Sequence, residues 1–274
     1  NENYFFENRG GTFVDVSDEI GLTGSDRWSS SAIFFDADRD GHLDLYVANY
    51  VHWTPEDDIR CEKDNGEKAY CIPAMYDGVP SAYYHNDGDG TFTERSVEAG
   101  FLTLERSGYG KSLGVSSMDY DRDDWPDLMV ANDGMGDFMY RNAGDGSFAE
   151  VGMRTGVAFS EHGEARAGMG IASGDLENEG RTSVVVGNFS EEMIGVYRYA
   201  GGGSFLDRAG ASRVGYDSML SLTFGLFLFD VNRDGFLDLF VANGHVYPYR
   251  TQEKDDITYR QNPQLFVNRS DGTF

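Results

Sequence analysis

The sequence is poor in basic residues and has no long apolar run. Its 22 lysines and arginines stand against 47 acidic residues, which gives a formal net charge of −25. Phosphate backbones and anionic lipid surfaces would repel such a chain, so we expect no nucleic acid partner. The apolar stretches are far shorter than the roughly 20 residues that span a bilayer, so we also expect no membrane insertion.

Cysteine is nearly absent, because only Cys61 and Cys71 are present. A structural zinc site needs a second pair of such ligands, and the sequence offers no matching pair. We therefore expect a disulfide, with two free thiols as the alternative. A disulfide would indicate an oxidising compartment, which makes the protein secreted and extracellular, periplasmic or at the cell surface.

What the sequence does contain is an internal repeat. An apolar run, an acidic loop and a second apolar run recur four times, and the loops start 83, 56 and 55 residues apart. They begin at Asp36, Asp119, Asp175 and Asp230. A second element, an aromatic residue followed by a Gly/Asp-rich turn and a closing phenylalanine, alternates with these loops. Its closing residues are Phe13, Phe92, Phe148, Phe205 and Phe274.

Two of the repeats are longer than the others. The extra residues are polar and rich in turn formers, so we expect loops at 51–78 and 247–261 on one rim of the array. We interpret 1–274 as a single domain. Its repeat units then span about 1–22 (the end of a unit), 30–101, 113–157, 169–211 and 224–274.

The apolar residues around the motifs predict strands. They are β-branched or aromatic, occur in short bursts between glycine-rich turns, and show no long helical period. A unit of about 56 residues with three or four strands is too long for a β-helix coil and fits a propeller blade. We therefore predict an all-β fold, a β-propeller of which about four blades and partial flanking blades are covered. Propellers close at roughly 4 to 8 blades, so the array is a near-minimal ring or part of a larger one.

The acidic loops have the spacing of calcium loops. Side-chain oxygens at positions 1, 3, 5 and 9, a carbonyl at position 7 and glycine at position 6 match the first part of the calcium-binding pattern. Position 12 is valine where an EF-hand has glutamate, which indicates a β-hairpin setting. The first and fourth loops are complete. Their predicted ligands are Asp36, Asp38, Asp40, the His42 carbonyl and Asp44, and Asp230, Asn232, Asp234, the Phe236 carbonyl and Asp238.

The other two loops depart from the pattern. The second has Asp124 in place of glycine, and its predicted ligands are Asp119, Asp121, Asp123, the Trp125 carbonyl and Asp127. The third, with Asp175, Glu177, Glu179 and a neutral Ser183, is expected to bind weakly or not at all. We predict two to three Ca²⁺ ions, or four if the third loop binds. The alternative is that these Asp-Gly turns simply join strands.

The alternating motifs resemble a known family. Asp-x-Asp-x-Asp-Gly-x-x-Asp-Leu loops and Tyr-Arg-Asn-x-Gly-Asp-Gly-x-Phe turns are similar to the FG-GAP/VCBS repeat of integrin-α-type propellers. Residues 45–50, 61–71, 130–133, 165–170 and 241–246 resemble secreted bacterial proteins of the ASPIC/UnbV group, which are related to the cartilage acidic protein. This resemblance implies a calcium-stabilised propeller of about seven blades, with further repeats and an ASPIC/UnbV domain outside these residues.

Three functions fit these observations, and no residue set indicates catalysis. The first is a non-enzymatic extracellular module for binding or scaffolding, whose inserted loops contact a protein or glycan partner. The second is a carbohydrate-binding or polysaccharide-lyase propeller, although the aromatic residues fall mainly in strand patterns that favour core packing. The third is an accessory subunit of a larger periplasmic or cell-surface assembly, docked through residues 51–78.

Overall fold

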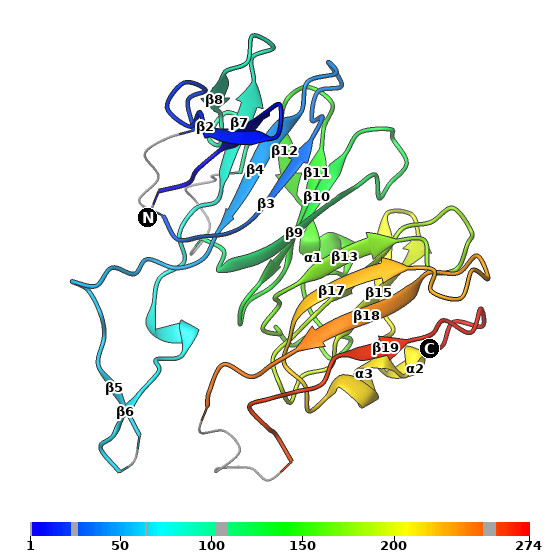
Figure 1. Cartoon of the computed structure of the whole chain (residues 1–274). Coiled ribbons are helices and arrows are strands. Elements are labelled where there is room, and N and C mark those ends of the chain that lie inside the picture. Colours follow the sequence, from blue (N-terminus) through cyan, green and yellow to red (C-terminus); the bar gives the residue numbers. More distant parts are fainter. Residues whose placement is uncertain (1, 23–26, 64, 102–108, 249–255) are drawn as a thin grey trace.

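The computed structural model describes residues 2–22, 27–63, 65–101, 109–248 and 256–274, and it consists of antiparallel β-sheets (Figure 1). The first sheet contains β3 (Ser29–Phe35), β4 (Asp44–Asn49), β7 (Ala82–Asn86) and β8 (Phe92–Glu94). The second contains β9 (Ser112–Met118), β10 (Asp127–Asn132), β11 (Phe138–Asn142) and β12 (Phe148–Glu150).

The next two sheets repeat this up-and-down order. The third contains β13 (Ile171–Gly174), β14 (Ser183–Val186), β15 (Gly195–Gly201) and β16 (Ser204–Asp207). The fourth has three strands, β17 (Thr223–Phe229), β18 (Asp238–Asn243) and β19 (Gln264–Phe266). Two hairpins stand apart from these sheets: β1 (Phe6–Arg9) with β2 (Thr12–Asp15), and β5 (Cys61–Glu62) with β6 (Lys68–Ala69). The predicted all-β fold is therefore confirmed.

Short helices that the sequence pattern did not reveal follow two of the sheets. They are α1 (Gly152–Thr155), α2 (Ala209–Ser212) and α3 (Val214–Ser218), and a 3-10 turn, η1 (Pro73–Met75), lies near β6. Helices of four or five residues are little more than one turn long, so the sequence shows no helical period for them. None of the helices in the described part of the chain is long and apolar enough to cross a membrane.

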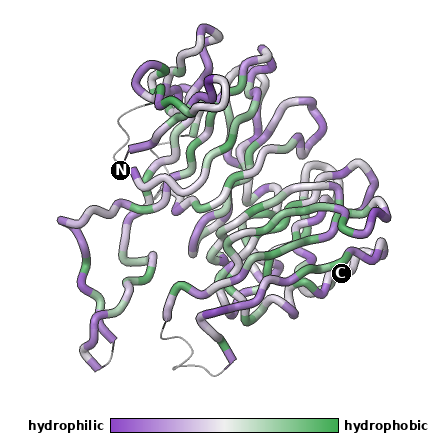
Figure 2. Tube along the Cα trace, in the orientation of Figure 1, coloured by the Kyte–Doolittle hydropathy of each residue, from purple (hydrophilic) through white to green (hydrophobic). Residues whose placement is uncertain are grey.

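The core lies between successive sheets, and both faces of the middle sheets are buried. In β10, Leu128 and Val130 pack with the first sheet, whereas Met129 and Ala131 pack with the third. Successive side chains of a strand point to opposite faces, so a strand covered on both sides reads as a continuous apolar run. Figure 2 shows these hydrophobic strands alternating with hydrophilic turns. The hydrophobic core is therefore formed mainly between sheets that are consecutive in the chain.

The first strands of consecutive sheets, β3, β9, β13 and β17, lie next to one another. Glycine makes this approach possible. A Cβ atom at Gly114 would clash with the carbonyl oxygen of Met169, and one at Gly170 would clash with that of Phe224. Both glycines lie five residues before an acidic loop, so the repeat places a backbone contact at the same point of the second and third sheets.

Residues 51–78 form a projection at the edge of the first sheet (Figure 1). A β-bridge between Val51 and Gly78 closes its base, and β5 and β6 form its tip. Cys61 and Cys71 form the expected disulfide within this projection. Of the second expected insertion, 247–261, residues 249–255 lie outside the described residues.

Candidate metal centre

All four acidic loops lie at one edge of the sheets. Each joins the first strand of its sheet to the second: β3 to β4, β9 to β10, β13 to β14 and β17 to β18. We call this side the acidic edge, and the loops at 36–44, 119–127, 175–183 and 230–238 the first to fourth loops. Because the strands are antiparallel, the connections between second and third strands, including residues 51–78, lie at the opposite edge, which we call the insertion edge.

The aspartate at the ninth loop position is a buried anchor. The Asp44 carboxylate accepts hydrogen bonds from the backbone N–H groups of Ala37 at 3.0 Å and Asn86 at 2.8 Å. Asp127 and Asp238 make the same pair of bonds in the second and fourth loops. These three side chains are at most 1% exposed. In these three loops the ninth position therefore ties the loop to the end of the third strand or to the residues just after it, a role beyond the one the sequence suggested.

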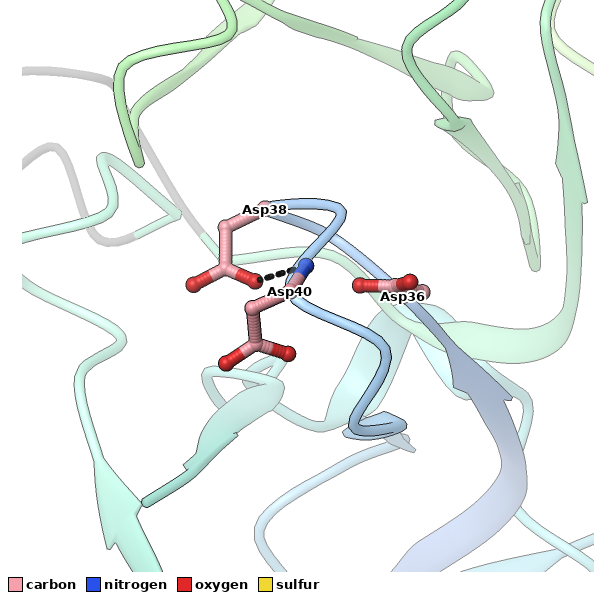
Figure 3. A group of neighbouring side chains, drawn as sticks. All are labelled: Asp36, Asp38 and Asp40. Atoms are coloured by element: carbon pink, nitrogen blue, oxygen red, sulfur yellow. Dashed lines mark hydrogen bonds between the residues drawn. The ribbon is translucent and has the colours of Figure 1, made fainter. Parts of the chain in front are cut away.

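The first loop gathers three carboxylates around one turn. Oxygens of Asp36, Asp38 and Asp40 all lie within 4.8 Å of one another (Figure 3). The Oδ2 atom of Asp36 accepts a hydrogen bond from the Gly41 N–H at 3.1 Å. Its Oδ1 atom is buried and has no hydrogen-bond partner. An acceptor buried in this way is costly unless a donor or a cation satisfies it, so the loop fits a bound cation.

The second loop shows the same feature with different surroundings. Oxygens of Asp119, Asp121 and Asp127 lie within 4.8 Å of one another, and Asp121 Oδ1 is buried without a hydrogen-bond partner. Asp124, which replaces the usual glycine, adopts a left-handed backbone with φ of 69°. The substitution at position 6 therefore preserves the turn.

Burial makes the Asp44 and Asp127 carboxyls difficult to ionise. It raises the pKa of Asp127 to about 7, although backbone N–H groups of Asn142 and Tyr120 oppose this shift. It also raises the pKa of Asp44, against the N–H groups of Asn86 and Ala37. A divalent cation favours the ionised form of nearby carboxyls and would lower both pKa values again.

The third and fourth loops have fewer carboxylate oxygens available to a cation than the first and second loops. In the third loop, Glu177 Oε1 lies 2.5 Å from Arg198 Nη1 and so points into an ion pair. In the fourth, Asn232 Oδ1 accepts the N–H of Asp234 at 3.0 Å, and Asp230 Oδ2 accepts that of Gly235 at 2.9 Å. Among the described residues, clusters of three acidic ligands occur in the first and second loops.

Asparagines in the turn motif join neighbouring loops, which the sequence analysis missed. Asn142 Nδ2 donates to the carbonyl of Ala37 at 2.7 Å, and Asn268 Nδ2 donates to that of Leu176 at 2.8 Å. Both acceptors occupy the second position of the preceding acidic loop. The recurrence of asparagine in the Tyr-Arg-Asn motif was the available signal, but the partner lies in another sheet. Tyr199 occupies this position in the third sheet.

A family model of the FG-GAP-like repeat matches residues 1–47 and 119–186. These two segments are similar to FG-GAP-like repeats. No curated protein matches it.

Solved structures that are similar to this chain include the following three. An Agrocybe aegerita lectin that recognises non-reducing terminal N-acetylglucosamine is 17% identical, with a TM-score of 0.41 over 99% of this chain and 72% of the lectin. The exotype rhamnogalacturonan lyase YesX is 15% identical, with a TM-score of 0.45 over 100% of this chain and 42% of the lyase. A Trypanosoma rangeli sialidase is 7% identical, with a TM-score of 0.39 over 89% and 36%.

The insertion edge carries aromatic residues from separate segments of the chain. Trp28 lies 5.6 Å from Trp53 and 5.9 Å from Tyr50, measured between ring centroids, and is 41% exposed. Tyr70, in the projection, stacks on Tyr247 at 6.0 Å. Side chains from both expected insertions therefore meet at this edge.

A buried acidic group also lies at the insertion edge, in the connection between β10 and β11. Burial raises the pKa of Asp137 to about 8, although the Asn132 N–H at 2.8 Å and the charge of Arg166 oppose the shift. Arg166 Nη2 itself lies 2.8 Å from Asp207. The sequence carried no signal for this group, because its burial depends on packing between the second and third sheets.

Proposed function

We propose that this chain is a calcium-binding β-propeller module of an extracellular or periplasmic protein, which acts by binding or scaffolding and not by catalysis. The observation that carries the proposal is the pair of buried, unpartnered oxygens, Asp36 Oδ1 and Asp121 Oδ1, each in a cluster of three carboxylates. Ligands that are all oxygen, on loops of this flexible kind, favour calcium over zinc and over magnesium.

The position of the loops supports a scaffolding role for the metal. Each loop joins the first two strands of its sheet, and the ninth-position anchors Asp44, Asp127 and Asp238 tie their loops to the end of the third strand or to the residues just after it. Asn142 and Asn268 extend the connection to the preceding loop. Calcium held in such a loop would stabilise the order of the strands and the contact between neighbouring sheets.

The outer face of the fourth sheet supports a larger ring. Phe227, Phe240 and Leu265 pair across the three strands on this face, where Phe227 is 51% and Leu265 46% exposed. Gly225 occupies the position of Gly114 and Gly170, yet a Cβ atom there would meet only Ala242, at 3.5 Å. In the second and third sheets the corresponding face is covered by the next sheet. We therefore propose that further blades cover this one and complete a ring of about seven.

The ring proposal can be tested with Phe227→Arg in a protein that includes the adjoining repeats. The charge is expected to destabilise the protein strongly if another blade covers the side chain. A variant that folds with unchanged stability would show that this face is free.

Metal content tests the calcium proposal directly. After dialysis against Ca²⁺, mass spectrometry of the native protein is expected to show two to three bound ions, and Asp36→Asn and Asp121→Asn should each remove one. Asp89→Asn is the matched control, because Asp89 lies in an exposed turn outside the acidic loops, where its side chain accepts the Thr91 N–H. A protein that binds no calcium would exclude the proposal.

The insertion edge is the proposed binding surface for a protein partner, including the larger assembly of which the chain would be an accessory subunit. Residues 51–78 project from the first sheet and contact the rest of the chain through groups such as Lys111 Nζ, which donates to the Pro73 carbonyl at 2.7 Å. Deletion of the tip, residues 56–72, is expected to release a co-purifying partner while the sheets remain folded. Retention of the partner would exclude this surface.

Carbohydrate binding is a second candidate, favoured by the exposed Trp28 beside Trp53. Indole rings at a surface stack on the apolar faces of sugars. Binding on a glycan array that Trp28→Ala abolishes would support this function. Absence of glycan binding, together with no cleavage of acidic polysaccharides, would exclude both the lectin and the lyase alternatives.

A further inference from the structure

One position on the third strand of each sheet faces the acidic loop. The strand pairings Leu45 with Tyr84, Leu128 with Tyr140, Val184 with Tyr197 and Leu239 with Phe266 are equivalent in the four sheets. The residue that follows the third-strand member of each pair therefore has the same place in every sheet. We call it the counter-ion position, and it is occupied by His85, Arg141, Arg198 and Val267 in the first to fourth sheets.

Arg141 bridges two predicted ligands of the second loop. Its Nε atom lies 2.5 Å from Asp121 Oδ2, and its Nη2 atom lies 2.7 Å from Asp123 Oδ2. The hydrogen bond to Asp121 raises the pKa of the guanidinium, which is charged at every physiological pH. Part of the charge repulsion within this loop is thus already neutralised by the protein itself.

Arg198 has the same role in the third loop, with a closer attachment. It pairs with Glu177 at 2.5 Å and donates through Nη2 to the Gly272 carbonyl at 3.0 Å. Its side chain is 10% exposed. Because Nη1 and Nη2 both have a partner, this guanidinium is fixed beside Glu177, the residue at position 3 of the loop.

The first and fourth loops have no permanent cation at the counter-ion position. His85 Nδ1 lies 3.1 Å from Asp44 Oδ1 and 3.7 Å from Asp38 Oδ2, and its imidazole lacks the fixed charge of a guanidinium. Val267 is apolar and has no charge to contribute. The carboxylates of these two loops therefore depend on an external cation.

We propose that the counter-ion position sets how strongly each loop depends on calcium. Arg141 and Arg198 act as built-in counter-ions, so that the second loop binds calcium weakly and the third is organised without it, whereas the first and fourth loops need the metal to be ordered. This inference rests on the proposed calcium function, and it concerns the ranking of the loops.

Competition for the same oxygen atoms is the physical basis. A cation seated in the second loop must share or displace the bonds that Arg141 makes to Asp121 and Asp123, and it meets a like charge a few ångströms away. A like charge at such short range is expected to lower the affinity for the cation by roughly tenfold or more. The buried Asp121 Oδ1 without a partner still offers one free ligand atom, so binding is weakened and not abolished.

Exchange of the residues at the counter-ion position tests this ranking in the whole chain. Arg141→Val is expected to tighten Ca²⁺ binding at the second loop by roughly tenfold or more, and to lower the metal-free melting temperature. Val267→Arg is expected to weaken binding at the fourth loop by a similar factor and to raise the metal-free melting temperature. Arg95→Val is the control, because Arg95 pairs with Asp87 at 3.1 Å, outside the acidic loops.

The second loop can be observed on its own. Of the three tryptophans, only Trp125 lies in an acidic loop. Because Arg39 of the first loop lies over the Trp125 ring, Tb³⁺ luminescence excited through tryptophan is measured with Asp36→Asn in both proteins, so that it reports the second loop. Tb³⁺ should bind at a lower concentration when Arg141→Val is added to this variant. Unchanged Tb³⁺ affinity, or loss of Tb³⁺ binding on addition of Arg141→Val, would overturn the counter-ion proposal. A protein that binds neither ion at any loop would instead overturn the calcium function itself.

Discussion

At the acidic edge the same loop recurs four times, whereas at the insertion edge every connection differs in length and sequence. The acidic loops share an anchor at position 9 in three sheets and bonds to the preceding loop in two. The insertion edge has a disulfide-closed hairpin on the first sheet and a buried Asp137 on the second. A repeated structure is typical of a scaffold, and variable connections are typical of partner recognition. The two edges should therefore respond differently to perturbation.

Removal of calcium is expected to have the largest effect on stability. This effect should come from the acidic edge, where all the proposed ions bind. A ligand present at 100 times its dissociation constant adds about 2.7 kcal/mol per site, so loss of two to three ions should lower the melting temperature by on the order of 10–20 °C. Calorimetry with and without a chelator measures the shift, and magnesium should not restore it. An unchanged melting curve in protein shown to be metal-free would contradict this expectation.

The largest contribution of the insertion edge to the free energy of unfolding should be one that depends on pH. Burial holds the pKa of Asp137 near 8, above its unfolded value, so its contribution to stability is fully present below about pH 4 and is lost as the pH rises to about 8. One proton is worth at most ~1.4 kcal/mol per pH unit. Asp137→Asn should flatten the pH dependence of the unfolding free energy in this window. An unchanged slope would show that Asp137 titrates normally.

Loss of an anchor carboxylate should cost ~2–4 kcal/mol, because two buried backbone donors lose their acceptor. Asp238→Ala removes the acceptor for the N–H groups of Val231 and Asn268. Chemical denaturation in the presence of a chelator separates this effect from metal loss. Asp271→Ala, in an exposed turn of the same sheet, should change stability by less than ~1 kcal/mol. Equal effects of the two changes would refute the anchor role.

The hydrogen bond between neighbouring loops should contribute less to the free energy of unfolding, and a comparison of two variants measures this contribution. Asn142→Ala removes the bond to Ala37 of the preceding sheet as well as the bond within its own loop. Asn86→Ala removes the equivalent bond within a loop, to the Leu43 carbonyl. Both changes also remove a bond that the side-chain oxygen accepts in the following turn, from the N–H of Gly88 or Gly144, so this loss cancels in the comparison. We expect Asn142→Ala to cost ~1 kcal/mol more than Asn86→Ala in denaturant titrations. Identical costs would mean that the inter-sheet bond contributes nothing.

The disulfide should have the smallest effect on global stability. Cys61 and Cys71 join the strands of a projection that lies outside the sheets, so Cys61→Ser with Cys71→Ser should change the free energy of unfolding of the sheets by less than ~1 kcal/mol. Hydrogen exchange of β5 and β6 should nevertheless accelerate. A fall of more than about 5 °C in the melting temperature would show that the projection supports the sheets.

Much of this architecture was predictable because it depends on residues close together in the chain. The alternation of apolar bursts and glycine-rich turns indicated the all-β fold, and the spacing of Asp36, Asp38 and Asp40 is enough to bring their carboxylates to one turn. The short α1, α2 and α3 helices were missed because four or five residues give no helical period. The roles of Arg141 and Asn142 were missed because their partners lie in acidic loops that are distant in the sequence.

The sequence by itself determined the repeat, the acidic loops and the disulfide, since each is specified by spacing within a short segment. Only the tertiary structure decided which charges meet. Strand register places Arg141 against Asp121, and sheet packing brings Asn142 to Ala37 and buries Asp137. Register and packing depend on contacts between distant segments, so the same acidic motif acquires a different electrostatic environment in each sheet.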